Sequence, residues 1–200
     1  MLPFPDIGTE RLVLRSWRAE DRMPFASLNG DPRVMEFMPR RLSVDESDAF
    51  AGRIENHFRQ HGFGLCAAEI RSNRAFIGFI GLQVPLFQAG FTPCVEIGWR
   101  LASGHWGQGL ATEGARAIVR YAFDELGLEE IVSFTVPANL RSRRVMEKLG
   151  MKRDPADDFN HPRLPADHRL SRHVLYRLRR GDWNAEGQCL SKTREFQSPY

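Results

Sequence analysis

Apolar and polar residues alternate along several short segments of the chain, and such alternation is typical of strands with one face in a core. Residues 11–15, Arg-Leu-Val-Leu-Arg, show the pattern first. Further along, a four-residue turn at 71–74 joins two apolar segments into a predicted hairpin. The predicted strands are 11–15, 63–70, 75–84, 95–101, 131–136 and 173–178, with another starting at 151–153.

Between these segments, apolar residues recur every three or four positions, a period that predicts helices. Ser43 opens one helix in a capping-box pattern, and the helix stops near Gly62. Phe50, Ile54 and Phe58 lie on one face of it. The predicted helices are 20–28, 31–37, 44 to about 62, 111–126 and 141–149.

The order of elements predicts a mixed α/β domain: strand, helices, three strands, helix, strand, helix, two strands. The chain has 200 residues, 42% of them hydrophobic, which is enough for one good core. We therefore predict a single domain over residues 1–180. Residues 181–200 are polar and aperiodic, and are predicted to form a disordered tail.

Charge and cysteine content exclude several classes of protein. A formal net charge of +3 suits a polyanionic cofactor but not the dense basic patch of a nucleic-acid binder. Cys66, Cys94 and Cys189 are far apart, which argues against a disulfide framework or a zinc site. No apolar run approaches the ~20 residues that span a membrane, and the N-terminus lacks a signal-peptide pattern. A cytoplasmic, bacterial-type enzyme without membrane contact is the expectation.

A glycine-containing loop, His-Trp-Gly-Gln-Gly at 105–109, separates the predicted strand 95–101 from the helix 111–126. Glycines at a strand-to-helix turn leave backbone N–H groups uncovered, and the helix start adds the positive end of its dipole. Such a turn suits a pyrophosphate. It does not match the dinucleotide-binding pattern, which needs a further glycine at the right spacing and an acidic residue about 20 residues on. It is not a P-loop either, because no Gly-Lys-Ser/Thr follows.

The loop resembles the acyl-CoA-binding signature of the GNAT N-acetyltransferases, Arg/Gln-x-x-Gly-x-Gly/Ala. Gly109, Leu110 and Ala111 fill the last three places. Trp106 stands where Arg or Gln is usual, which resembles the RimJ/RimL-type branch and its Trp-Gly-x-Gly-x-Ala-Thr-Glu pattern. The resemblance covers about residues 9–178. It implies the GNAT fold, a mixed central sheet of about seven strands that is splayed between the fourth and fifth and flanked by helices.

The resemblance also implies acetyl-CoA as co-substrate, with no metal. Its pyrophosphate would lie on the loop, and its pantetheine arm would fill the gap between strands 95–101 and 131–136. The residues expected to bind it are Trp99, Arg100, Leu101, Trp106, Gly107, Gln108, Gly109, Leu110, Ala111, Thr112, Asn139, Ser142 and Arg144. Glu113, in the first turn of the helix, is interpreted as mainly structural.

Asn139 and Ser142 match an Asn-x-x-Ser pattern of the same branch. The resemblance implies that Asn139 bonds the pantetheine arm and that Ser142 protonates the leaving thiolate. Each residue also has a purely local interpretation. Asn139 is a good helix N-cap, and Ser142 is placed to make capping contacts in the first helical turn.

Glu96 is the candidate general base. It shares one strand face with Gly98 and Arg100, and an acid beside a glycine on a central strand is unusual. Acetyl transfer needs a neutral amine, whereas amines have pKa values of ~8 to ~10.4, so a base or a water relay helps. The alternative is a structural ion pair between Glu96 and Arg100 or another cation.

The acceptor side is expected from two less distinctive segments. Residues 154–172 correspond to the loop that lies beside the acceptor in the family, so Asp158 and His161 are candidates for substrate contact. Glu36 and Phe37 would line the opposite wall, although this turn also reads as a small core cluster. The spacing of His161, His168 and His173 matches no zinc motif, so no metal site is expected.

These features predict an acetyl-CoA-dependent N-acetyltransferase, in which a primary amine attacks the thioester directly. A backbone N–H near Arg100 or Leu101 would stabilise the oxyanion. The acceptor would be a protein N-terminus or a small molecule, and dimers are common in the family. Two alternatives remain: a non-catalytic acyl-CoA-binding regulator on the same fold, and a ribosome- or RNA-associated binding protein.

Overall fold

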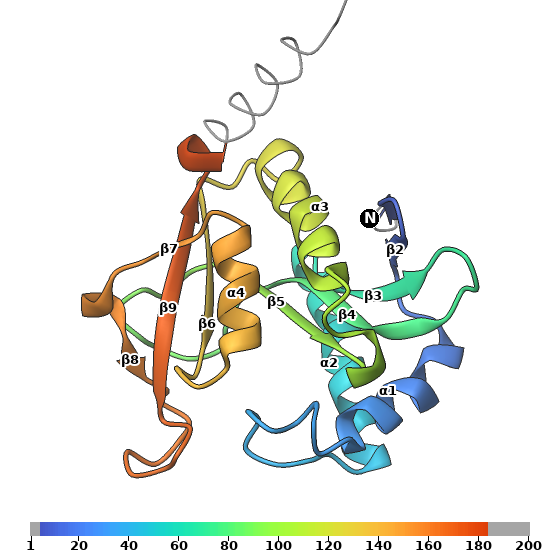
Figure 1. Cartoon of the computed structure of the whole chain (residues 1–200), viewed down its shortest axis with the longest axis horizontal. Helices are drawn as coiled ribbons and strands as arrows, with labels where there is room; N and C mark the ends of the chain where they lie inside the picture. Colours follow the sequence, from blue (N-terminus) through green and yellow to red (C-terminus); the bar gives the residue numbers. More distant parts are fainter. Residues whose placement is uncertain (1–4, 184–200) are drawn as a thin grey trace, which may run out of the picture.

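A single mixed sheet of nine strands organises the computed structural model, which describes residues 5–183. The strands run in the order β1-β2-β3-β4-β5-β6-β9-β7, and β8 pairs with β9 (Figure 1). Every pairing is antiparallel except that of β5 with β6. The strands are β1 (Ile7–Gly8), β2 (Leu12–Arg15), β3 (Leu65–Ile70), β4 (Phe76–Gln83), β5 (Glu96–Leu101), β6 (Glu130–Thr135), β7 (Lys152–Arg153), β8 (Phe159–Asn160) and β9 (Arg172–Arg179).

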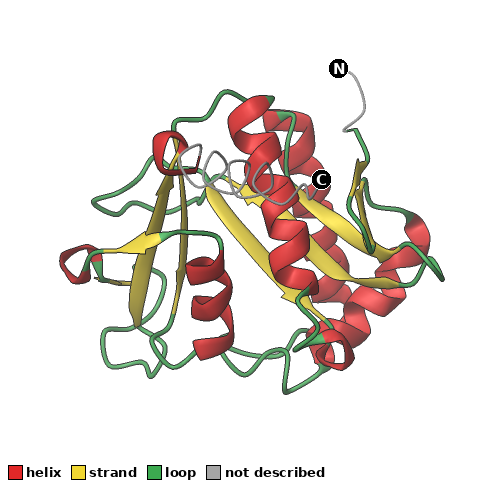
Figure 2. Cartoon of the chain, turned by 45° about the horizontal axis from the view of Figure 1, so that its top comes forward, coloured by secondary structure: helices red, strands yellow, loops and turns green. Residues whose placement is uncertain are grey.

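Helices cover both faces of the sheet (Figure 2). The helices are α1 (Arg22–Gly30), α2 (Val44–His61), α3 (Leu110–Asp124) and α4 (Leu140–Lys148), with the short 3-10 turns η1 (Ala19–Asp21), η2 (Ser103–His105) and η3 (Pro155–Asp157). One core joins α3 and α4 to the sheet, and a second joins α1 and α2 to its other face. Gly114 lets α3 approach the sheet closely, because a Cβ there would lie 2.4 Å from the Ile80 side chain.

The sheet opens between its two parallel strands. β4 and β5 share six register pairs, whereas β5 and β6 share one, Glu96 with Val132. The Val132 N–H donates to the Val95 carbonyl at 2.9 Å just beside that pair. Beyond it the strands diverge, as Figure 2 shows, so the predicted splay lies between the predicted strands. In the sheet's own numbering these strands are the fifth and sixth, because β1 precedes them.

The capping box at Ser43 and the end of α2 at Gly62 are confirmed. Two strands were missed, β1 and β8, because two residues are too short to show a period. The predicted helix 31–37 is wrong, since the segment forms turns. Asp31 Oδ1 accepts the Arg33 N–H at 2.9 Å, which offers the backbone a local alternative to a helix.

A buried ionic network ties the first strands to η1. Arg15 is 2% exposed and donates to Asp21 and to Glu69, each at 2.7 Å. Both carboxylates are buried, and their hydrogen bonds raise the pKa of Arg15 further above its ordinary range. The network therefore satisfies three charges that would be costly to leave unpaired.

The folded region extends slightly beyond the predicted boundary at residue 180. Residues 181–183 are helical, and Trp183 packs against the larger core. The remainder of the predicted tail, 184–200, lies outside the described residues, as does Cys189. In the part of the chain that is described, no helix is both long and apolar enough to cross a bilayer.

Candidate active site

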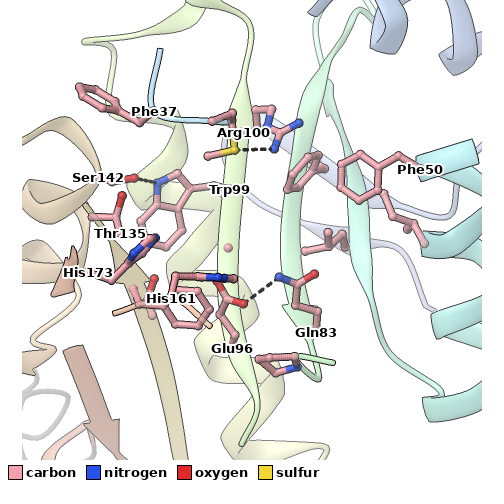
Figure 3. A pocket seen from close by; sticks show the side chains of 18 of the residues that line it. Phe37, Phe50, Gln83, Glu96, Trp99, Arg100, Thr135, Ser142, His161 and His173 are labelled. Carbon is pink, nitrogen blue, oxygen red and sulfur yellow. Dashed lines mark hydrogen bonds between the residues drawn. The ribbon is translucent and has the colours of Figure 1, made fainter. Parts of the chain in front are cut away.

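A cavity of about 860 Å³ opens at the splay. Its size is that of a typical small-molecule site. Its wall is built by the loop after α1, by α2, by the ends of β4, β5 and β6, by α4 and by the loop before β9 (Figure 3). The cavity brings together eight of the predicted site residues: Phe37, Glu96, Trp99, Arg100, Trp106, Asn139, Ser142 and His161.

Glu96 lies at the point where β5 and β6 separate. It is 8% exposed, and Gln83 Nε2 donates to its Oε2 at 2.8 Å (Figure 3). Burial raises the pKa of Glu96 to about 8, against the smaller opposing effect of the Gln83 hydrogen bond. Among the described residues Glu96 has no ion-pair partner, so the structural ion pair considered from the sequence is absent there. A carboxyl group with such a pKa is suited to proton transfer near neutral pH.

Ser142 lines the same cavity as Glu96 from the far side of the splay, in the first turn of α4. The indole N–H of Trp99 donates to Ser142 Oγ at 3.1 Å (Figure 3). The hydroxyl oxygen is therefore an acceptor in this bond, and its own proton stays available to another group. Asn139 Oδ1 accepts the Ser142 backbone N–H at 3.2 Å, which confirms Asn139 as the N-cap of α4.

Both glycines of the loop adopt a backbone conformation that glycine accommodates better than other residues. Gly107 and Gly109 have φ angles of 74° and 80°, a left-handed conformation that side chains disfavour. Gly109 is the N-cap of α3, and no side chain caps the N–H groups of the first turn. These donors and the helix dipole form a site for an anion.

Arg11, which the sequence did not single out, fixes this loop to the sheet. Its Nη1 donates to the Gln108 carbonyl at 2.9 Å, and its Nε donates to Glu113 at 2.7 Å. Thr9 also donates to Glu113, at 2.6 Å. Glu113 is thus engaged in holding the loop, in line with its structural interpretation. No local sequence pattern indicated this role of Arg11, because its partners lie about a hundred residues away in the sequence.

Comparison with known proteins agrees with this geometry. The family model described as an acetyltransferase (GNAT) domain matches residues 11–152. The chain belongs to the GNAT acetyltransferase family. It is 31% identical over 207 residues to the FsC-acetyl coenzyme A-N(2)-transacetylase of Aspergillus fumigatus, with 96% of this chain and 84% of that protein covered.

Solved GNAT structures share the fold. An acetyltransferase from Agrobacterium tumefaciens has a TM-score of 0.72 and 26% identity, covering 90% of this chain and 97% of that one. RimJ of Mycobacterium smegmatis, solved in complex with CoA-disulfide, has a TM-score of 0.71 and 17% identity, covering 92% and 95%. The latter identity shows the fold alone, so the RimJ/RimL branch stays a prediction.

The other residues predicted to bind acetyl-CoA lie around the cavity but do not line it. Leu101 and Leu110 are buried in the larger core, so only their backbones are available. Gln108 folds its side chain back to the Gly104 carbonyl at 3.1 Å. The remaining members are the exposed loop glycines Gly107 and Gly109, the half-buried Ala111 and Thr112 in the first turn of α3, and the exposed Arg144 in the middle of α4.

The acceptor-side predictions divide in the same way. Phe37 and His161 line the cavity, whereas Glu36 and Asp158 do not. Glu36 forms an ion pair with Arg141 at 2.9 Å. Asp158 is held by Arg153, whose Nε donates to it at 3.0 Å, so its carboxylate is already neutralised outside the cavity.

His161 and His173 form an aromatic wall beside Phe134. The two imidazole rings lie 5.1 Å apart, and burial lowers the pKa of each below its ordinary value. Both rings are therefore expected to be neutral at pH 7. Within the described residues, no group of three or more potential ligands is placed to hold a metal ion.

The side chain of Arg100 leaves the predicted acetyl-CoA path and reaches the α1–α2 face. Its Nη1 donates to Asn29 Oδ1 at 2.7 Å and its Nη2 contacts Met38 Sδ at 3.1 Å (Figure 3). The guanidinium lies 5.5 and 5.4 Å from the ring centres of Phe50 and Phe79. Burial lowers its pKa to about 10, so it stays charged at neutral pH.

Proposed function

We propose that this GNAT protein is an acetyl-CoA-dependent N-acetyltransferase that acts on a primary amine by direct attack. The observation that carries the proposal is the buried Glu96, with its pKa raised to about 8, at the open end of the splay. Ser142 lies on the other side of the same cavity. The site therefore offers a proton acceptor and a proton donor on either side of the gap.

The described residues fit acetyl-CoA as co-substrate. The uncapped first turn of α3 and the left-handed Gly107 and Gly109 would hold the pyrophosphate. Asn139 already spends its Oδ1 on the helix cap and its Nδ2 on Thr135, at 3.1 Å. Its amide nitrogen carries a second hydrogen, which would be the donor to the pantetheine arm.

Backbone N–H groups along β5 point alternately toward β4 and toward the splay, and this alternation favours Leu101 over Arg100 as the predicted oxyanion donor. A Cβ built on Gly78 would lie 2.0 Å from the Arg100 carbonyl oxygen, so that peptide edge faces β4. The Val95 carbonyl accepts a hydrogen bond from β6, so the peptide groups of odd-numbered β5 residues point to the β6 edge and those of even-numbered residues to the β4 edge. The N–H groups of Trp99 and Leu101 therefore point toward the splay. We assign the oxyanion contact to Leu101 or Trp99 rather than to Arg100.

In the proposed reaction, the amine nitrogen attacks the thioester carbonyl carbon and the carbon–sulfur bond breaks. Ionised Glu96 accepts the proton that the amine loses, directly or through water. Ser142 gives its hydroxyl proton to the thiolate, and the proton that Glu96 took replaces it through solvent, so both residues return to their starting states. The name of the Aspergillus fumigatus relative, an acetyl coenzyme A-N(2)-transacetylase, supports nitrogen as the acceptor atom. A protein N-terminus and a small amine both remain candidate acceptors, and cytoplasmic location and a homodimer stay predictions.

Calorimetric titration with acetyl-CoA tests the cofactor site. We expect micromolar binding that falls at least ~30-fold in Gly109→Asp, which adds bulk at a left-handed position and negative charge at the pyrophosphate. Gly90→Asp is the control, because Gly90 is exposed and has open space around it. Unchanged binding in Gly109→Asp, with its circular dichroism intact, contradicts the site.

A thioester-consumption assay across varied amines then tests catalysis. Consumption that depends on an amine supports the transferase. Binding without consumption favours the acyl-CoA-binding regulator. Strong, salt-dependent RNA binding without acetyl-CoA binding favours the ribosome-associated alternative.

A further inference from the structure

Arg100 is a half-buried cation without an acidic partner among the described residues. Its hydrogen-bond acceptors, Asn29 Oδ1 and Met38 Sδ, are both neutral. No ion pair at Arg100 is found in residues 5–183, whereas the buried Arg15 binds two carboxylates. Withdrawing a charge from water without a counter-charge is costly, and at Arg100 the described residues supply no such counter-charge.

The surroundings hold Arg100 in place rather than neutralise it. Asn29 is fully buried and donates to Ser47 Oγ at 2.8 Å, so the amide that receives the guanidinium is itself fixed. The rings of Phe50 and Phe79 pack beside the guanidinium. Two N–H groups are thereby engaged, and the others stay available on the side that lines the cavity. A pre-oriented guanidinium is well suited to a carboxylate.

The excess of positive charge in the cavity wall also favours binding of a carboxylate. Five arginines line it, but Glu96 is the one carboxylate among its described lining residues. Arg33 and Arg141 are paired with Asp31 and Glu36, at 3.1 and 2.9 Å. The lining arginines without an ion pair in the described chain are Arg53, Arg100 and Arg163. Such a wall attracts anions and repels polycations.

We propose that the acceptor is a primary amine that also carries a carboxylate, which Arg100 binds while the amine lies at Glu96. Both residues belong to β5, share one strand face and line one cavity. Their Cα atoms are on the order of 13 Å apart along the strand, which leaves room for the two ends of one small acceptor or of a short peptide segment. Polyamines would place a second cation against Arg100 and are expected to be poor substrates. This inference rests on the proposed N-acetyltransferase function.

The test compares carboxylate-bearing amines with their uncharged amides. A series of ω-amino acids of increasing length is assayed against the matching primary amides, in wild type, Arg100→Gln and Arg100→Lys. Two tripeptides, Gly-Asp-Gly and Gly-Asn-Gly with amidated C-termini, distinguish a peptide source of the carboxylate from a free amino acid. Arg120→Gln is the control, because it removes the same charge from an exposed position on α3.

In wild type we expect kcat/KM to favour the acid over the amide by about 10- to 100-fold for at least one pair. Arg100→Gln should remove this preference through KM, with a much larger loss for the acid than for the amide, and Arg100→Lys should partly restore it. Arg120→Gln should retain the preference. Equal use of acid and amide by wild type, or an equal loss for both in Arg100→Gln, overturns the proposal.

Direct binding separates this proposal from the proposed function. The best acid and its amide are titrated by calorimetry into the CoA-bound wild type and Arg100→Gln. Tighter binding of the acid that depends on Arg100 supports the carboxylate site even when no amine is acetylated, in which case only the transferase assignment fails. Equal binding of acid and amide overturns the site whether or not turnover is seen.

Discussion

Replacing Glu96 by Gln should stabilise the protein at alkaline pH while it removes the proposed base. Glutamine is nearly isosteric with glutamate, and its side-chain oxygen can accept the same hydrogen bond that Gln83 donates to Glu96 at 2.8 Å. The change therefore removes a buried ionisable group and preserves its geometry. Any difference between the two proteins that depends on pH then reports the ionisation of Glu96.

The magnitude follows from the pKa. Burial raises the pKa of Glu96 from 4.5 to about 8. Because the folded state holds the proton more tightly than the unfolded state, stability is greatest below the unfolded pKa and declines as pH rises through the folded one. Each pH unit between the two values costs about 1.4 kcal/mol, so the penalty above pH 8 is on the order of 4–5 kcal/mol as an upper value.

The assay is urea denaturation followed by circular dichroism at pH 5, 7 and 9, with Glu10→Gln as the matched control at an exposed position. Near pH 5, wild type and Glu96→Gln should unfold with free energies within about 1 kcal/mol. At pH 9 the variant should be more stable by about 2–5 kcal/mol, because its side chain cannot ionise. A difference that stays constant from pH 5 to pH 9 would refute the reasoning, since Glu96 would then titrate normally.

Three further predictions follow from the site and the core. The kcat/KM for an amine of low pKa should rise with pH through about 8, because Glu96 must be ionised to act as a base, and Glu96→Gln should lose this limb in a pH–rate profile. Ser142→Ala should lower kcat by about 10- to 100-fold with acetyl-CoA affinity nearly unchanged by calorimetry; full turnover would remove Ser142 as the acid. Arg15→Leu should lose about 3–5 kcal/mol of unfolding free energy, because it leaves the buried Asp21 without its cation and removes the most buried of the cations at Glu69. Arg74→Gln, which alters an exposed cation 3.7 Å from the same Glu69, should lose less than about 1 kcal/mol in the same denaturation assay.

Local pattern and family resemblance predicted most of the scaffold. The strand periods located β2 to β6 and β9, and the capping box at Ser43 located the start of α2. The errors fall where a local period is absent. β1 and β8 are two residues long, and the segment after α1 satisfies its backbone through Asp31 rather than through a helix.

In the candidate site, too, the residues that a local pattern predicts differ from those whose role depends on long-range packing. Glu96, Asn139 and Ser142 were predicted from strand alternation and a short motif, and all three line the cavity. Gln83, which bonds Glu96, gave no signal because its role depends on the register of β4 against β5. The surroundings of Arg100 were equally hidden, since they come from α1 and from the loop that follows it.

Long-range pairs therefore account for what the sequence left open. Asp158 looked free in a polar loop, but Arg153 on the neighbouring β7 neutralises it. Arg11 looked like the edge of a strand, but it holds the glycine loop. Both outcomes depend on which side chains the sheet brings together, and no spacing within one segment encodes that.

The two tryptophans at the splay give the protein an intrinsic optical reporter. Trp99 donates across the gap to Ser142, and Trp106 donates to the Leu101 carbonyl at 2.8 Å while Arg141 lies 4.4 Å above its ring. Both indoles line the cavity. A thioester that binds there should therefore change the polarity of their surroundings and their hydrogen bonds. Their emission should therefore shift as the gap fills, and occupancy can be followed in real time in the unlabelled, unmodified chain.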